Sequence, residues 1–208
     1  MRSIARIVAS LTIAFLLVPN VTYAHSKADF HDAMRKLWED HVTWTRLFIV
    51  SAAAGLPDKD ATTQRLLQNQ TDIGNAVAEF YGRDAGNKLT ALLRDHILIA
   101  ADIVKAAKAN DTKAVEAGQK KWRQNGDQLA AFLASANPVW KQQALTDMLQ
   151  RHLDFVTQQV VARIKADWPG DIRAYDAGYE HMMMFADMLS DGIIRQNPKK
   201  IIISEASK

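Results

Sequence analysis

Three histidines recur along this chain at nearly equal spacing, and imidazole can bind a metal, take up a proton or form a buried hydrogen bond. His41, His96 and His152 are the three positions, so the repeat has a period of about 55 residues. Each follows two apolar and two polar residues and precedes an apolar one. Self-similarity at such a period is typical of a repeated supersecondary unit.

A second polar residue follows each histidine at a nearly constant interval. Asn69 follows His41, Asn125 follows His96 and His181 follows His152, each about half a period further along the chain. The sequence therefore predicts three copies of one unit of about 55 residues, each carrying a polar pair.

Two kinds of chemistry fit the repeated histidines. If the segments that carry them pack around a common axis, three imidazoles would lie at similar heights, where they could bind zinc, copper, nickel or iron, or ligate non-covalent haem. Alternatively, each histidine is buried as neutral imidazole and hydrogen-bonded to Asn69, Asn125 or a nearby Asp, because buried polar groups need partners. The second interpretation explains the repetition equally well, and we favour it.

A soft-metal site is a further candidate near the C-terminus. His181, Met184 and Met188 share one helical face, and imidazole with thioether suits copper(I). Core packing is the competing interpretation, because methionine fills irregular gaps and Phe185 and Leu189 extend the same apolar face. The metal-binding alternative thus comprises His41, His96, His152, His181, Met184 and Met188.

An ion pair is expected between Arg46 and Asp72. Arg46 lies shortly after His41, and Asp72 lies one turn past Asn69. Asp187 is a second candidate partner for the same arginine. The pair would be either a buried structural contact or a solvated contact at the edge of the fold.

The elements that position these residues are expected to be helices. Apolar residues recur at intervals of three and four, and glycine and proline fall mainly between these segments, where helices are expected to end. The predicted helices span 28–54, 60–81, 84–109, 112–135, 138–167 and 171–195. They pair into three hairpins, so the expected fold is an all-α bundle of six helices.

The segment 1–24 is interpreted as a secretory signal peptide. Arg2 and Arg6 precede an apolar run from Ile7 to Val18, and Thr22-Tyr23-Ala24 offers a cleavage site. Removing both arginines lowers the formal net charge from +3 to +1 (3 minus 2), so the chain is not basic enough to predict nucleic-acid binding. We expect an exported protein, periplasmic or extracellular.

The mature chain is expected to be one domain. Cleavage after Ala24 leaves the segment 25–208, which is long enough for a single core. We assign that core to 25–198, with a loose tail at 199–208. The chain has no cysteine, which excludes disulfides, iron–sulfur clusters and covalently attached haem. No later segment is apolar enough to cross a bilayer.

Several short motifs resemble a family of small bacterial helical proteins. They are Trp38-x-x-His41-x-x-Trp44, Asn69-Gln70-x-Asp72, Leu92-Leu93-x-x-His96, Trp122-x-x-Asn125, Met148-Leu149-x-x-His152 and Ala174-Tyr175-Asp176. Members often carry the labels glycosyltransferase or acetylglutamate kinase. Those activities need a parallel sheet or a glycine-rich phosphate loop, and the sequence predicts neither. The favoured function is an exported, non-enzymatic interaction or envelope-associated module with an unknown protein partner.

Overall fold

The computed structural model describes residues 26–198, 200 and 201, and these form a six-helix bundle without a strand. The predicted signal peptide and most of the C-terminal tail lie outside the described residues. The predicted all-α fold is confirmed. The helices are α1 (Lys27–Ala54), α2 (Lys59–Tyr81), α3 (Arg83–Lys108), α4 (Thr112–Ala136), α5 (Gln142–Ile164) and α6 (Trp168–Gln196).

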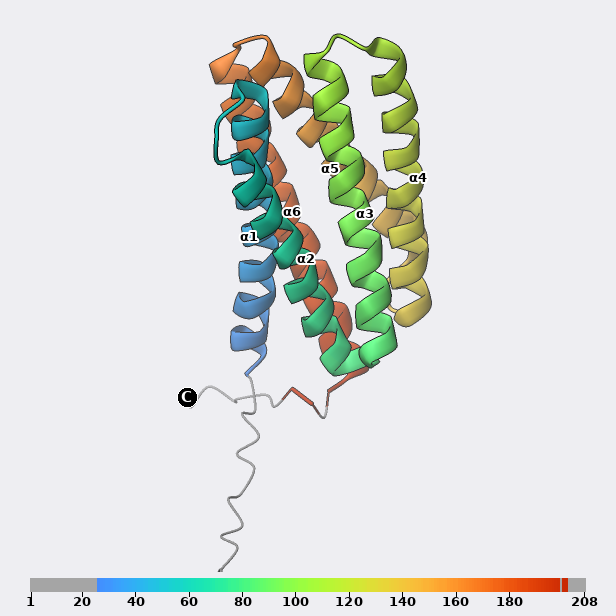
Figure 1. Cartoon of the computed structure of the whole chain (residues 1–208). Helices are drawn as coiled ribbons and strands as arrows, with labels where there is room; N and C mark the ends of the chain where they lie inside the picture. The colour runs from blue at the N-terminus through green and yellow to red at the C-terminus, as the bar shows by residue number, and fades with distance from the viewer. Residues whose placement is uncertain (1–25, 199, 202–208) are drawn as a thin grey trace, which may run out of the picture.

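The helices run alternately up and down and close into a ring (Figure 1). Each helix packs on the next along the chain, and α6 returns to pack on α1. Helix α1 also contacts α3 and α5 across the interior. The hairpins therefore form a closed bundle with a shared centre, and α1, α3 and α5, which carry the repeated histidines, meet there.

The fifth helix begins later than predicted. Pro138 is the first residue of the predicted helix 138–167, which leaves Asn137 in the N-cap position, but the helix begins at Gln142. Asn137 instead organises the preceding turn: its Nδ2 donates to Tyr81 Oη at 2.9 Å, and its Oδ1 accepts from the Val139 amide at 3.0 Å. A half-buried tertiary partner thus diverts a typical capping residue into a turn.

The sixth helix begins earlier than predicted. Asp167 accepts a hydrogen bond from the Gly170 amide at 3.0 Å, and Trp168 is already helical. Pro169 lies in the first turn, where its missing N–H has no helical partner to lose. The chain reverses at Ala166, which adopts a left-handed φ of 58°.

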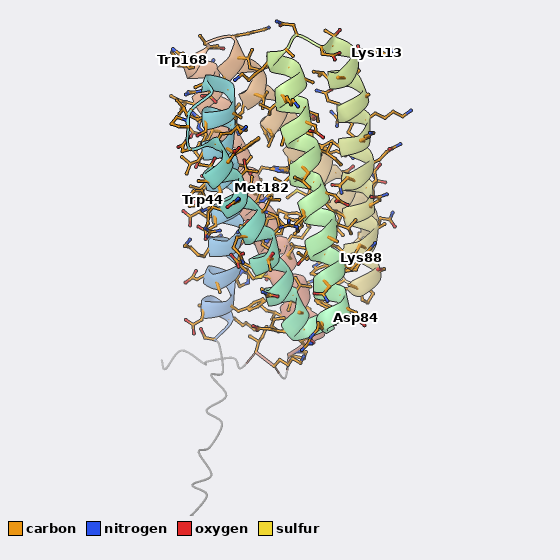
Figure 2. All side chains as sticks on the ribbon, viewed as in Figure 1. Trp44, Asp84, Lys88, Lys113, Trp168 and Met182 are labelled. Carbon is orange, nitrogen blue, oxygen red and sulfur yellow. The ribbon has the colours of Figure 1, made fainter. Side chains whose placement is uncertain are left out.

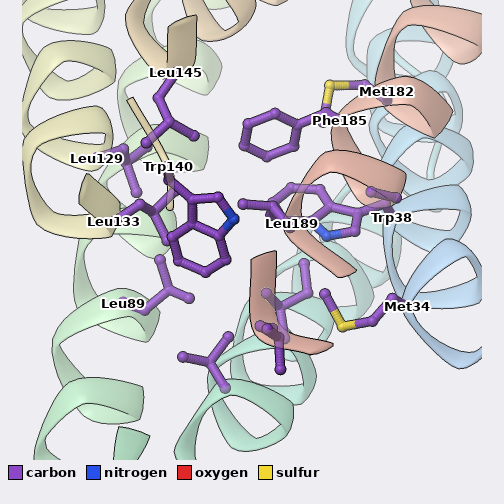
Figure 3. Close-up of a cluster of buried hydrophobic side chains, with 14 of the residues drawn as sticks. Met34, Trp38, Leu89, Leu129, Leu133, Trp140, Leu145, Met182, Phe185 and Leu189 are labelled. Atoms are coloured by element: carbon purple, nitrogen blue, oxygen red, sulfur yellow. The ribbon is translucent and has the colours of Figure 1, made fainter. Parts of the chain in front are cut away.

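The core of the bundle contains a cluster rich in aromatic residues (Figure 3). The rings of Trp38 and Phe185 meet edge to face with centroids 5.0 Å apart. Trp140 places its indole in the same cluster and donates Nε1–H to the Met188 carbonyl at 3.2 Å. Ile201 is also buried there, so the tail predicted to be loose from residue 199 begins by packing against the core.

Apart from the buried Asp171, the Asp, Glu, Lys and Arg residues that the structure describes are exposed or half-buried. Figure 2 shows Asp84, Lys88 and Lys113 at its periphery and Trp168 at the end where α5 joins α6. Of the helices in residues 26–198, none has the length and hydropathy needed to traverse a bilayer.

Two glycines allow α2 and α3 to approach closely. A Cβ at Gly86 would lie 2.5 Å from the Gly74 carbonyl oxygen and 2.6 Å from Ala78 Cβ. A flexible side chain could move away from an added Cβ, but a packed backbone cannot. Helices α2 and α3, and with them the first and second hairpins, therefore pack this closely only because Gly74 and Gly86 lack a side chain.

We predict that Gly86→Ala destabilises the protein although alanine favours helix. Overpacking against backbone costs about 1–3 kcal/mol, which outweighs a propensity gain of about 1 kcal/mol. Gly126→Ala is the matched control, because its Cβ would meet nothing closer than Gln150 Nε2 at 3.4 Å. Chemical denaturation should show a loss for Gly86→Ala and no loss for Gly126→Ala. Equal effects would contradict the close approach of α2 and α3.

Candidate functional site

The three repeated histidines meet at the centre of the bundle. His152 lies between the other two, with its ring centroid 5.6 Å from that of His41 and 6.1 Å from that of His96. The His96 and His152 rings are nearly parallel, with an interplanar angle of 20°. All three side chains are between 2% and 5% exposed. The closed ring of helices therefore produces one imidazole cluster from residues on α1, α3 and α5.

Each hairpin also repeats one hydrogen bond between its two helices. Asn69 Nδ2 donates to the Leu37 carbonyl at 2.9 Å, and Asn125 Nδ2 donates to the Leu92 carbonyl at 3.0 Å. In the third hairpin, His181 Nε2 lies 2.8 Å from the Met148 carbonyl. In every case the acceptor is the residue four positions before the repeated histidine, so this contact fixes the height of the second helix against the first.

The middle hairpin adds the predicted contact between His and Asn side chains. His96 Nδ1 lies 2.8 Å from Asn125 Oδ1. Because Asn125 Nδ2 donates to the Leu92 carbonyl, its Oδ1 is the acceptor and His96 Nδ1 carries the proton. In the first hairpin, Gln70 bonds to Asn69 Oδ1 at 3.1 Å and stands beside the His41 ring. The polar pair thus differs in detail between the hairpins.

Burial keeps the three imidazoles neutral. It lowers the pKa of His41 to about 3, with a further lowering by His96 and a small opposing effect of Gln70. It lowers the pKa of His96 to about 4, against a raising effect of the hydrogen bond with Asn125. The pKa of His152 lies well below its ordinary value because of burial and then of the charges that His41, His96 and His181 would carry. Neutral imidazole is the form that binds metals, but also the form that a core tolerates.

Two internal cavities flank the imidazole cluster. One has a volume of about 60 Å³ and lies mainly between α1, α3, α4 and α5; the other has about 20 Å³ and lies on the side of the aromatic cluster. All three histidines line both cavities. Thr45 and Trp122 line the larger one, and sequence analysis identified neither as a functional candidate. Thr45 lies one turn after His41, and Trp122 lies one turn before Asn125. This helical spacing is the sequence signal that could have placed both side chains beside the imidazole cluster.

The metal-binding alternative finds little support in this geometry. Within residues 26–198, 200 and 201, no three His, Cys, Asp or Glu side chains are arranged to hold a metal ion. His181 uses Nε2 on a carbonyl, and the Met184 side chain is 57% exposed, so these two predicted soft donors are not brought together in the core. A cavity of about 60 Å³ is also far below the roughly 300–1,000 Å³ of pockets for larger ligands, so it cannot hold haem.

The predicted partner of Arg46 is corrected by the structure. Arg46 forms a two-pronged ion pair with Asp171 at the start of α6, and its Nη2 lies 2.8 Å from Asp171 Oδ2. Arg163 Nη1 contacts the same carboxylate oxygen at 3.3 Å. Arg46 also lies over the Tyr175 ring, 5.2 Å from its centroid. Asp171 is almost fully buried, so one carboxylate connects α1, α5 and α6.

The two candidate partners have other contacts. Asp72 accepts from Gln68 Nε2 at 3.0 Å and lies 3.8 Å from Arg65 Nη1 at the surface of α2. Asp187 pairs with Arg35 at 2.6 Å, and the hydrogen bond from Arg35 lowers the Asp187 pKa. Helix α6 runs antiparallel to α1, so its beginning lies beside the second half of α1, and this direction selects Asp171.

Comparisons with known proteins found no matching family model, no matching curated protein and no matching solved structure. The resemblance to a bacterial helical family therefore stays a prediction.

We predict that Asp171→Asn destabilises the protein by about 2–3 kcal/mol, because it leaves two arginines facing a neutral group in a partly buried site. Asp72→Asn is the matched control on a surface pair and should change the free energy of unfolding by about 0.5 kcal/mol or less. Urea unfolding of both variants measures the difference. Equal losses would contradict the assignment of Asp171 as the buried partner.

Proposed function

We propose that this chain is an exported, non-enzymatic helical module that works by contact with another protein. The observation that carries the proposal is the position of the imidazole cluster. Its three rings lie in the centre of a closed bundle, and the larger cavity beside them has a volume of only about 60 Å³. An acid–base or nucleophilic site must admit its substrate to the reactive atoms, and a cavity of this volume holds no more than a small group, far less than the roughly 300–1,000 Å³ of typical ligand pockets.

Exposed apolar side chains support a role in contact with a partner. Ile164, Trp168 and Ile172 are 40%, 50% and 52% exposed and lie around the turn between α5 and α6. Tryptophan at a surface is enriched in protein interfaces because it combines a large apolar area with one hydrogen-bond donor.

The imidazole cluster further makes the fold sensitive to acid. A histidine whose pKa is lower in the folded protein stabilises the fold fully above its unfolded value near 6.5, and this stabilisation is lost as the pH falls toward the folded value. For His41 and His96 this window runs from about 6.5 down to about 3 and about 4. A module exported from the cell meets changes in external pH. It would be folded in neutral surroundings and would lose its fold in acidic surroundings.

We predict that the free energy of unfolding falls steeply between pH 6.5 and 4.5. Each buried neutral histidine contributes a slope of about 1.4 kcal/mol per pH unit in this window. His41→Gln should remove one such contribution, and urea unfolding at half-unit pH intervals measures the slope. Thr45→Val, a neighbour without a titrating group, is the control and should keep the full slope. A stability independent of pH would disprove the buried neutral cluster.

Export has a separate test that does not depend on the fold. Expression of the full chain in a bacterium should yield a protein in the periplasm or medium that begins at His25 and ends at Lys208. Intact-mass spectrometry of the fractions measures the cleavage. Replacing Leu16 and Leu17 with arginine should retain the full-length chain in the cytoplasm. Full-length protein in every fraction of the unaltered chain would contradict export.

A further inference from the structure

The larger cavity combines apolar walls with unpartnered polar atoms. Four residues that line it each have a buried side-chain atom without a hydrogen-bond partner among the described residues: His41 Nδ1, Thr45 Oγ1, Trp122 Nε1 and His152 Nδ1. Native interiors leave few such atoms without a partner. That four of them gather around one cavity points to a polar occupant.

The chemistry of the lining restricts the occupant to uncharged molecules. None of the described residues around the cavity is Asp, Glu, Lys or Arg, and its histidines are neutral. An ion in such surroundings would lack both water and a counter-charge. Trp122 Nε1 can only donate a hydrogen bond, so the occupant must accept one. A neutral imidazole nitrogen without a proton accepts, so an occupant that also donates fits better. A hydroxyl group does both.

A surface cleft adjoins the internal cavity near the C-terminal end of α1. It has a volume of about 550 Å³ and lies among α1, α2 and α3, and Phe48 and Val104 line both this cleft and the internal cavity. Phe48 therefore lies where the two spaces adjoin. The lining of the cleft combines apolar side chains with charged ones, which are Lys59, Asp60, Asp102, Lys105 and Lys108. The internal cavity alone has room for about two water molecules at ~30 Å³ each, so only a small polar end fits there.

We propose that this cavity binds the hydroxyl end of a small uncharged molecule, such as a short-chain alcohol, which enters past Phe48. The hydroxyl lies between Trp122 and the imidazoles of His41 and His152, and the alkyl part extends along Phe48 toward the cleft. This site is independent of the proposed export and of the partner contact, and a failure of either leaves it unchanged.

The test uses 1-propanol as probe and the tryptophan side chains as reporters. In the ¹H–¹⁵N spectrum of the folded protein, the Trp122 indole signal should move and saturate during titration with 1-propanol. The Trp140 indole is an internal control, because its Nε1 already donates to the Met188 carbonyl at 3.2 Å. Sodium propionate serves as the charged comparison and should leave the Trp122 signal in place.

Three variants locate the site. Ala100→Leu adds bulk to the cavity wall and should weaken 1-propanol binding at least about tenfold. Ala91→Leu, an exposed position on the same helix, should leave the affinity unchanged. Thr45→Val removes one hydroxyl at nearly constant shape and should weaken binding about two- to tenfold, the worth of one neutral hydrogen bond. Circular dichroism establishes that each variant is folded.

Three results would overturn the proposal. In the first, the Trp122 signal fails to saturate with 1-propanol. In the second, propionate binds as well as the alcohol, which would place the ligand at the lysines of the cleft. In the third, folded Ala100→Leu protein keeps the affinity of the unaltered protein.

Discussion

Removal of three imidazoles from water is the constraint on which the rest of this structure depends. A neutral imidazole in a core is most stable where the helices around it supply polar partners and exclude competing charges. The middle hairpin supplies such a partner, because Asn125 Oδ1 lies 2.8 Å from His96 Nδ1, whereas His41 Nδ1 and His152 Nδ1 have no partner among the described residues. In each hairpin, Asn69, Asn125 or His181 also donates to a main-chain carbonyl one turn before the histidine, and this contact links the two helices at the height of the cluster.

The cluster also organises the interior into two regions. On one side the rings face the aromatic cluster that contains Trp38 and Phe185, and on the other they face the larger cavity. The smaller cavity lies on the aromatic side, and the larger one lies beside four residues that each have an unpartnered polar atom. The ligand that we propose for the larger cavity would therefore contact histidines that also pack the centre of the bundle.

A second polar connection lies toward the end of the bundle where α5 joins α6. Asp171 receives Arg46 from α1 and Arg163 from α5, and it thereby ties the last helix to the first. This ion pair is one of several contacts that close the ring between α1 and α6, the two helices most distant in sequence. The exposed Trp168 and Ile172 lie next to Asp171 on α6. The surface that we propose as a partner contact therefore lies beside this ion-pair network.

The sequence by itself determined the helices and the inward face of the histidines. Apolar spacing of three and four residues reports the local helical period, and the nearly constant interval between the histidines reports equal lengths of successive hairpins. Only the tertiary structure decided that α6 closes on α1, that Arg46 meets Asp171 instead of Asp72, and that Asn137 binds Tyr81 instead of capping a helix. Periodicity is a property of one segment, whereas these outcomes depend on which segments lie side by side. The cavity was equally beyond sequence reasoning, because empty space results from the fit of several helices and has no signature in any one of them.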